Sequence, residues 1–219
     1  MRFQDRRQAG RTLATLLLAR GDERPVVVAL PRGGVPVAYE IATALGAPLD
    51  VLVVRKIGAP GNPEFGVGAI AEGGIQVLSP PALAAARASP ADVAPTIARE
   101  EQELERRLVA YRPGRALADV QGRTVVLVDD GLATGITAVA AVRALRRLGA
   151  AHVVLAVPVA APESVVALRQ EADDVVAAEV PARLGGIGSW YDDFTQTTDE
   201  EVLRLLGDPA VRPSPPPPP

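Results

Sequence analysis

Residues 123–148, RTVVLVDDGLATGITAVAAVRALRRL, constrain the fold more than any other part of the chain. The apolar run at 125–128 is too short for a helix and is rich in β-branched residues, so it predicts a buried strand. Two acids follow, then small and hydroxylated residues at 131–137. Apolar residues then recur at helical spacing; they are Ile136, Val139, Ala140, Leu145 and Leu148. The segment is therefore expected to form a strand, a tight turn and a helix.

The predicted turn suits a phosphate group. A helix N-terminus presents unpaired backbone N–H groups and the positive end of the helix dipole, and both favour an anion. Gly135 lets the backbone approach a ligand closely, and the hydroxyls of Thr134 and Thr137 can donate further hydrogen bonds.

Asp129 and Asp130, at the end of the predicted strand, suit a different group. Ionised carboxylates only accept hydrogen bonds, so they hold a phosphate poorly and a pair of vicinal hydroxyls well. A phosphate at one end and a diol at the other describe a ribose 5-phosphate. Two acids alone would more simply be solvated turn residues. The complete pattern, DDxxxTGxT behind a buried strand, favours the ligand-binding interpretation.

The stretch VVLVDDGLATGIT resembles the phosphoribosyl diphosphate (PRPP) binding signature of type I phosphoribosyltransferases. The resemblance implies that Asp129 and Asp130 hold the 2′- and 3′-hydroxyls of the ribose. It also implies that the following turn wraps the 5-phosphate; its residues are Ala133, Thr134, Gly135, Ile136 and Thr137. A Walker P-loop would end in G-K-[ST], which is absent, so nucleoside triphosphate hydrolysis is not predicted.

A second glycine turn follows the first predicted strand, residues 26–30. Arg32, Gly33 and Gly34 could close backbone N–H groups around an anion, although a plain turn would explain the glycines about as well. In the resembled family the turn after the first core strand binds the pyrophosphate of PRPP. The resemblance therefore implies this role here, with charge added by Arg32.

Arg55 and Lys56 end another predicted strand, residues 49–54. They resemble the arginine–lysine segment of adenine phosphoribosyltransferases, which implies that they contact pyrophosphate and take part in catalysis. Without the resemblance they would be cations facing solvent at a strand end. Residues 57–74 contain six glycines and two prolines. We expect them to form a mobile lid without a packed core.

The aromatic residues cluster near the C-terminus. The chain has three Phe, three Tyr and one Trp, and Trp190, Tyr191 and Phe194 fall within five residues. Residues 181–198 are expected to be a flap over the sheet, or more specifically a hood that holds an acceptor base. The pattern D-F-x-Q-x-x-D-E-E-V is similar to a little-characterised bacterial phosphoribosyltransferase subgroup. It departs from the purine and orotate enzymes, so their base-recognition residues cannot be transferred.

Continuous apolar strands alternate with helical segments along the chain. This pattern predicts an α/β fold, a doubly wound, mostly parallel five-stranded sheet with a small hood, and ligands beyond the carboxyl ends of the strands. Residues 1–207 are expected to form a single domain, followed by a disordered proline-rich tail at 208–219. The first helix, residues 4–20, is expected to turn Arg6, Arg7 and Arg11 outward. A charged helix at 96–111 would suit packing on the sheet or at a homodimer interface.

Composition and charge argue against several classes of function. The net charge is −3 and no run of Lys and Arg exceeds two residues, which argues against nucleic acid as a partner. There is no cysteine and one histidine, so a disulfide and a His/Cys zinc site are excluded. No apolar run approaches the length of a membrane span, and the charged N-terminus does not resemble a signal peptide. We expect a cytoplasmic protein without a membrane partner.

These features together predict a phosphoribosyltransferase that binds PRPP and a small-molecule base. It would transfer the 5-phosphoribosyl group to a nitrogen of that base and release pyrophosphate. Mg²⁺ would be held through PRPP, near Asp129 and Asp130, and not by a dedicated set of protein ligands. The alternative is a non-catalytic regulator on the same fold that senses PRPP or a nucleotide. The residues leave the acceptor base open.

Overall fold

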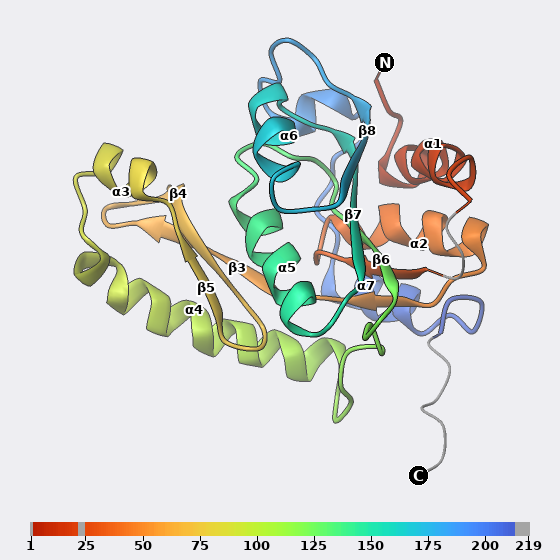
Figure 1. The fold of residues 1–219 in the computed structure, drawn as a ribbon, viewed down its shortest axis with the longest axis horizontal. Helices are drawn as coiled ribbons and strands as arrows, with labels where there is room; N and C mark the ends of the chain where they lie inside the picture. The colour runs from red at the N-terminus through yellow and green to blue at the C-terminus, as the bar shows by residue number, and fades with distance from the viewer. Residues whose placement is uncertain (1, 22–24, 213–219) are drawn as a thin grey trace.

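The computed structural model describes residues 2–21 and 25–212, and its main body is a five-stranded parallel sheet between two layers of helices (Figure 1). The strand order is β2-β1-β6-β7-β8 and every pairing is parallel. The strands are β2 Leu49–Val51, β1 Val26–Ala29, β6 Thr124–Val128, β7 His152–Val159 and β8 Asp174–Glu179. The predicted fold class is confirmed.

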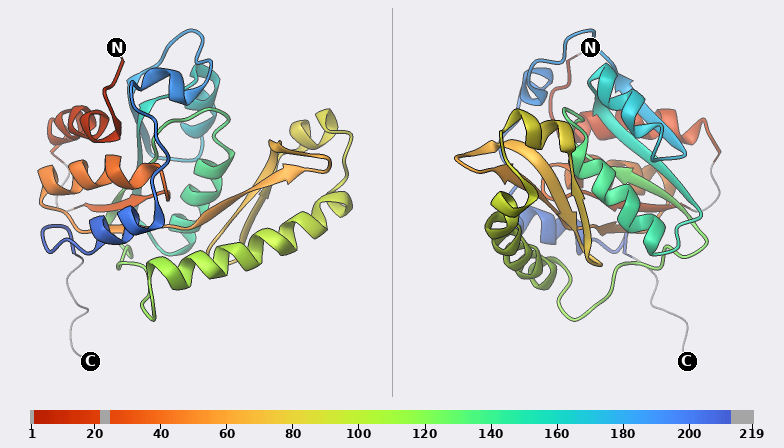
Figure 2. Two further views of the ribbon diagram at one scale, coloured as in Figure 1. Left: turned by 180° about the vertical axis from the view of Figure 1, so that it is seen from behind. Right: turned by 60° about the vertical axis from the view of Figure 1, so that its left-hand side comes forward.

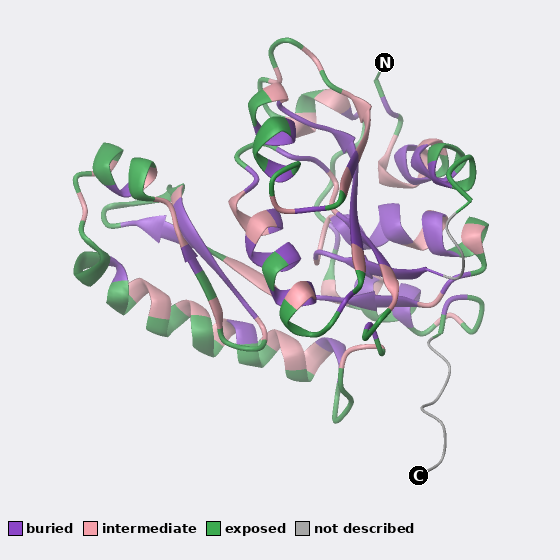
Figure 3. Cartoon of the chain, viewed as in Figure 1, coloured by how far each residue is buried: buried purple, intermediate pink, exposed green. Residues whose placement is uncertain are grey.

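The central strands are apolar throughout because helices cover both faces of the sheet. Along β1, Val27 and Ala29 belong to the core under one helical layer, and Val26 and Val28 belong to the core under the other. The first layer contains α1 Arg6–Leu18, α2 Gly34–Leu45 and α7 Asp199–Leu206; the second contains α5 Ile136–Arg147 and α6 Pro162–Leu168. Figure 3 shows the buried strands lying between these partly exposed helices.

Residues 54–111 form an arm that stands away from the main body (Figure 2). Three antiparallel strands, β3 Val54–Ala59, β4 Asn62–Ala71 and β5 Ile75–Leu78, pair in that order. Two helices complete the arm, α3 Pro80–Ala85 and α4 Pro90–Tyr111. α4 begins earlier than the predicted residue 96 because Ser89 caps it: the Ser89 hydroxyl accepts from the Asp92 N–H, and the Asp92 carboxylate accepts from the Ser89 N–H.

The expectation that residues 57–74 lack a packed core is wrong. Ile57 and Val67 are fully buried, and two of the glycines lie where strands approach closely. A Cβ added to Gly58 would lie 2.5 Å from the carbonyl oxygen of Pro63, and one on Gly68 would lie 2.5 Å from that of Val77. These glycines therefore permit close backbone packing and are not a sign of a loose loop.

The first part of the predicted disordered tail is also packed, which corrects the expectation for residues 208–212. Val211 is buried, and its carbonyl oxygen accepts a 2.7 Å hydrogen bond from the N–H of Leu49 at the start of edge strand β2. The hydroxyl of Tyr39 donates to Asp208 at 2.7 Å. The prolines at 213–219 lie outside the described residues. Among the described helices, none has both the length and the apolar character needed to cross a membrane.

The arm yields a stability prediction. Ile57→Ala should lower the free energy of unfolding by about 2–5 kcal/mol, because a fully buried side chain would leave a cavity in the core. Glu64→Ala, on the same hairpin but with a side chain 95% exposed, should change it by less than about 0.5 kcal/mol. Urea denaturation of both variants gives the comparison. An unchanged midpoint for Ile57→Ala would show that this hairpin has no packed core.

Candidate active site

The site is built where β1 and β6 end side by side. Ala29 and Val128 are register partners, so the loop after β1 runs beside Asp129 and Asp130, which follow β6. A Cβ on Gly33 would overlap the carboxylate of Asp130, since it would lie 2.6 Å from Cγ. A Cβ on Gly34 would lie 2.6 Å from the carbonyl oxygen of Val128. Glycine is therefore required for this contact, and the structure brings the two glycine-containing segments together as predicted.

The two acids differ in their surroundings. Oδ1 of Asp129 accepts a 2.8 Å hydrogen bond from the N–H of Asp130. Burial raises the pKa of Asp129 well above its ordinary value, and the charge of Asp130 raises it further. The positive charge of Arg6 opposes this effect. Asp130 forms an ion pair with Arg6, with 2.8 Å between Oδ2 and Nε.

The turn after the acids leads into α5, at whose N-terminus the sequence predicts an anion site. Gly135 precedes α5 with a φ of 74°, a left-handed conformation that favours glycine. The first N–H groups of the twelve-residue helix that follows have no partners within the helix. Ala133 and Thr134 are exposed. A side-chain hydrogen bond holds the turn in place: the carbonyl oxygen of Ala133 accepts from the Ser164 hydroxyl at the start of α6.

Strand alternation sends Arg55 and Lys56 to opposite faces of β3. The stem of Lys56 lies against Gly66, whose added Cβ would be 3.0 Å from Lys56 Cδ and 3.9 Å from Ile136 at the start of α5. Arg55 instead donates two hydrogen bonds, of 2.9 and 2.6 Å, to Glu100 on α4. The stem of Lys56 therefore lies near the start of α5, but its ammonium donates to the carbonyl oxygen of Glu64 at 3.0 Å, so both cations have partners within the arm.

Arg32 reaches in a third direction. Its Nη1 lies 3.7 Å from Oδ1 of Asp199, at the N-terminus of α7. A cis peptide bond joins Pro31 to Arg32. The guanidinium is thus directed towards the start of α7.

The aromatic segment covers the acids as a hood. It contains the short 3-10 helix Ile187–Trp190, and a Cβ on Gly131 would lie 2.5 Å from the Ile187 side chain. The buried Tyr191 hydroxyl donates to the carbonyl oxygen of Asp130 at 2.6 Å, so this ring is committed to packing. The Phe194 ring stacks on that of Tyr191, 5.0 Å between centroids, and keeps an exposed edge. Trp190 donates its indole N–H to the carbonyl oxygen of Leu184 at 2.9 Å.

The expectation that Arg6 faces outward is wrong. Its side chain is only 11% exposed, and it lies between Asp130 and the hood. The helical pattern of the sequence gave no signal for these contacts. The hydrogen-bond partners of Arg6 are Asp130 and Thr195, and both are more than 120 residues away in the chain. The nearest hint was Asp5, whose carboxylate caps α1 by accepting from the N–H of Gln8 at 2.7 Å and so places Arg6 in the first turn.

Comparison with known proteins agrees with this geometry. The family model of the phosphoribosyl transferase domain matches residues 4–185, which include the acids, both glycine turns and the whole arm. The chain belongs to the phosphoribosyltransferase family. Its fold and its relatives place it with the type I members.

Two relatives of this phosphoribosyltransferase chain cover nearly all of it. The Mycobacterium tuberculosis protein named "Putative phosphoribosyl transferase" is 45% identical over 204 residues, 93% of this chain. This chain spans 46% of that relative, about half its length. The crystal structure of TT1426 from Thermus thermophilus is 49% identical, covers 94% of this chain and 98% of its own, and superposes with a TM-score of 0.79.

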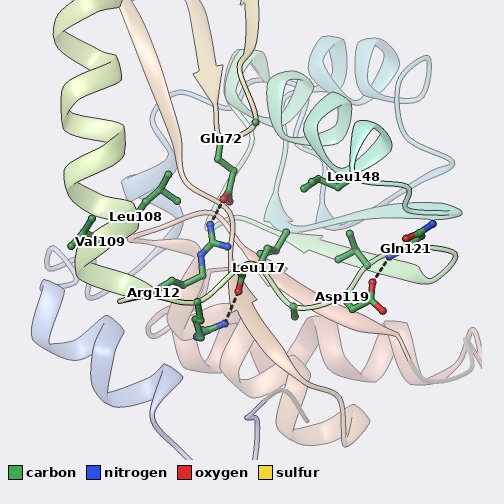
Figure 4. Close-up of a pocket in the computed structure, with 14 residues that line it drawn as sticks. Glu72, Leu108, Val109, Arg112, Leu117, Asp119, Gln121 and Leu148 are labelled. Carbon is green, nitrogen blue, oxygen red and sulfur yellow. Dashed lines mark hydrogen bonds and ion pairs between the residues drawn. The ribbon is translucent and has the colours of Figure 1, made fainter. Parts of the chain in front are cut away.

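A separate cavity of about 480 Å³ lies away from the acidic pair (Figure 4). It is lined by the end of α4, the β4–β5 turn and the segment leading into β6, and its polar centre is the ion pair of Glu72 with Arg112. Burial raises the pKa of Glu72, although Arg112 opposes the shift. The pair links the β4–β5 turn to the residue that follows α4.

The raised pKa of Asp129 predicts a stability effect with a definite sign. A folded-state pKa above the ordinary value of about 4 means that folding is increasingly penalised as pH rises through and beyond that value. Asp129→Asn removes the charge and can still accept from the Asp130 N–H, so it should be more stable than the wild type at pH 7. The gain should shrink as pH falls towards 4, because the wild-type carboxyl is then increasingly protonated in the unfolded state as well as in the folded state.

Urea denaturation between pH 4 and pH 8 tests this expectation. Asp119→Asn, which changes an exposed acid in the segment leading to β6, is the matched control and should follow the wild type. Parallel pH profiles for Asp129→Asn and the wild type would contradict the account.

Proposed function

We propose that this chain transfers the 5-phosphoribosyl group of PRPP to a nitrogen of a small-molecule base and releases pyrophosphate. The observation that carries the proposal is the contact of the Gly33 turn with Asp130, beside a second turn that opens α5. Two backbone anion sites with a pair of carboxylates between them match the two phosphate ends and the central diol of PRPP.

Each part has a defined role in the proposed reaction. The turn from Ala133 to Thr137 binds the 5-phosphate through backbone N–H groups and threonine hydroxyls. Asp129 and Asp130 accept hydrogen bonds from the ribose hydroxyls. Their negative charge favours the positive ring that develops as the bond from C1 to the pyrophosphate oxygen breaks, so part of their effect appears only in the transition state.

The leaving pyrophosphate would be received by the first glycine turn and by cations around it. The N–H of Gly33 could donate to the anion and Arg32 belongs to the same turn, whereas the N–H of Gly34 already donates to the carbonyl oxygen of Leu30 at 3.1 Å. To join them, Lys56 would have to leave the carbonyl oxygen of Glu64, and Arg55 would have to leave Glu100. A base would then be held against the exposed parts of Phe194 and Trp190.

Mg²⁺ fits this arrangement as a companion of PRPP. Among the described residues no group of three or more His, Cys, Asp or Glu side chains could hold a metal ion. Asp129 and Asp130 offer hard oxygen atoms, and Mg²⁺ is commonly bound by one or two carboxylates together with substrate phosphates. When bound, the ion would neutralise charge on the leaving pyrophosphate.

The second candidate is a regulator that binds PRPP or a nucleotide without turnover. One observation favours it: Arg6 donates a 2.8 Å hydrogen bond to one oxygen of Asp130, which leaves fewer acceptor sites for a ribose. A binding protein could keep this ion pair and the two anion sites unchanged. Location in the cytoplasm and assembly as a homodimer remain expectations from the sequence under either proposal.

Variants of the acids and of the turn should separate ribosyl chemistry from simple phosphate binding. Asp129→Asn and Asp130→Asn should each lower kcat about 10- to 100-fold, since each carboxylate loses a charge-assisted hydrogen bond. Affinity for inorganic phosphate should survive, because that anion binds at the turn. Thr134→Ala should instead raise KM for PRPP by about 2- to 10-fold and change kcat less.

The assay follows pyrophosphate release from PRPP and Mg²⁺ with a panel of bases. Uracil belongs in the panel because a uracil phosphoribosyltransferase of Lactobacillus gasseri is 45% identical over 92 residues, 41% of this chain. If the chain bound PRPP but released pyrophosphate with none of the bases, the regulator would be favoured. Wild-type rates in both Asn variants would refute the proposed use of the acids.

A further inference from the structure

We propose that Arg6 is a positioning residue for Asp130. Through this role, Arg6 couples the placement of the aromatic hood to the acidic pair. The inference rests on the proposed function, because it assigns a role in binding the ribose of PRPP. Neither of the two predicted phosphate turns contains Arg6, which reaches the acids from the first turn of α1.

Three contacts fix the guanidinium of Arg6. Its Nε donates to Oδ2 of Asp130 at 2.8 Å, and its Nη1 donates to the carbonyl oxygen of Thr195 at 2.8 Å. Its Cζ lies 4.0 Å from the centroid of the Phe194 ring, within the range of a cation–π contact. One planar group therefore touches the acidic pair and the hood at once.

Burial distinguishes this ion pair from an ordinary surface contact. The side chains of Arg6 and Asp130 are 11% and 15% exposed, so solvent screens their interaction little. The contact uses Oδ2 of Asp130 and so sets the direction of the other oxygen, Oδ1. With Asp130 held in this way, Oδ1 needs no reorientation before it accepts a ribose hydroxyl.

Arg6 is itself held by pairing of the N-terminal segment with the hood. Phe3 donates its N–H to the carbonyl oxygen of Trp190 and accepts from the N–H of Asp192, both at 2.8 Å. The Phe3 ring is fully buried against that of Tyr191, whose hydroxyl donates to the carbonyl oxygen of Asp130. The N-terminal segment therefore contacts the side chain of Asp130 through Arg6, and the hood contacts its backbone through Tyr191.

The geometry predicts how movement of the hood would reach the acids. A shift of Thr195 or Phe194 would displace the guanidinium, and the guanidinium would turn the carboxylate of Asp130. An acceptor base that enters beneath the hood would therefore affect how well the ribose is held. Arg6 acts through Asp130 and needs no contact with the reacting atoms.

Arg7 provides a matched control on the same helical turn. Its Nη1 pairs with Glu40 at 2.9 Å, and its guanidinium lies 5.3 Å from the ring of Tyr39, so it makes the same two kinds of contact away from the acids. Arg6→Met and Arg7→Met each remove one guanidinium and keep an apolar stem. A purely structural role for both arginines would give the two variants the same properties.

The experiment measures PRPP affinity by calorimetry in the presence of Mg²⁺, kcat and KM for PRPP, and affinity for inorganic phosphate. Arg6→Met should weaken PRPP binding and raise KM at least tenfold, with phosphate affinity unchanged. Arg7→Met should stay within twofold of the wild type in all of these. Arg6→Lys should recover part of the loss, because an ammonium can reach Asp130 but cannot also bond Thr195 and stack on Phe194.

The double variant Arg6→Met/Asp130→Asn tests whether the arginine acts through the acid. Its PRPP affinity should fall no further than that of Asp130→Asn alone. Independent, additive losses would overturn the inference, as would equal behaviour of Arg6→Met and Arg7→Met. Should Arg6→Met fail to fold, Arg6→Lys alone and combined with Asp130→Asn makes the same comparison. A wild-type chain that binds no PRPP would instead refute the proposed function, and the role of Arg6 with it.

Discussion

Asp130 is the residue at which distant parts of the chain meet. Its side chain abuts Gly33 in the turn after β1 and pairs with Arg6 in α1, and its carbonyl oxygen accepts from Tyr191 in the hood. A second carboxylate stands beside it on Asp129, partly buried and with a raised pKa. Holding two acids together is unfavourable by itself, so this edge of the sheet depends on the groups packed around it.

The parallel sheet makes this meeting possible. Adjacent parallel strands end at the same edge, so the turns after β1 and β6 come together although about 100 residues separate them. Gly33 and Gly34 then allow the two segments to approach closely, and the left-handed conformation of Gly135 leads the chain from the second turn into α5. The arm adds Lys56 from a separate sheet. The hood, together with the N-terminal segment that pairs with it, covers the acids.

Features with a strong local pattern were predictable from the sequence. The apolar strands specified the sheet, and the order of acids, glycine and threonine specified the central turn. Glycine content misled the interpretation of residues 57–74, because the same residue permits both loose loops and tight strand packing. The contact of Arg6 with Asp130 and the pairing of Arg55 with Glu100 depend on tertiary placement, which periodicity does not record.

The central claim is that the acids hold a ribose between two anion-binding turns. A crystal structure of the wild-type chain with PRPP and Mg²⁺ tests this most directly. We predict the 5-phosphate at residues 133–137, the pyrophosphate at the turn of Gly33, and the ribose hydroxyls within hydrogen-bonding distance of Asp129 and Asp130. A ribose turned away from both carboxylates, or a ligand bound at another edge of the sheet, would contradict the account.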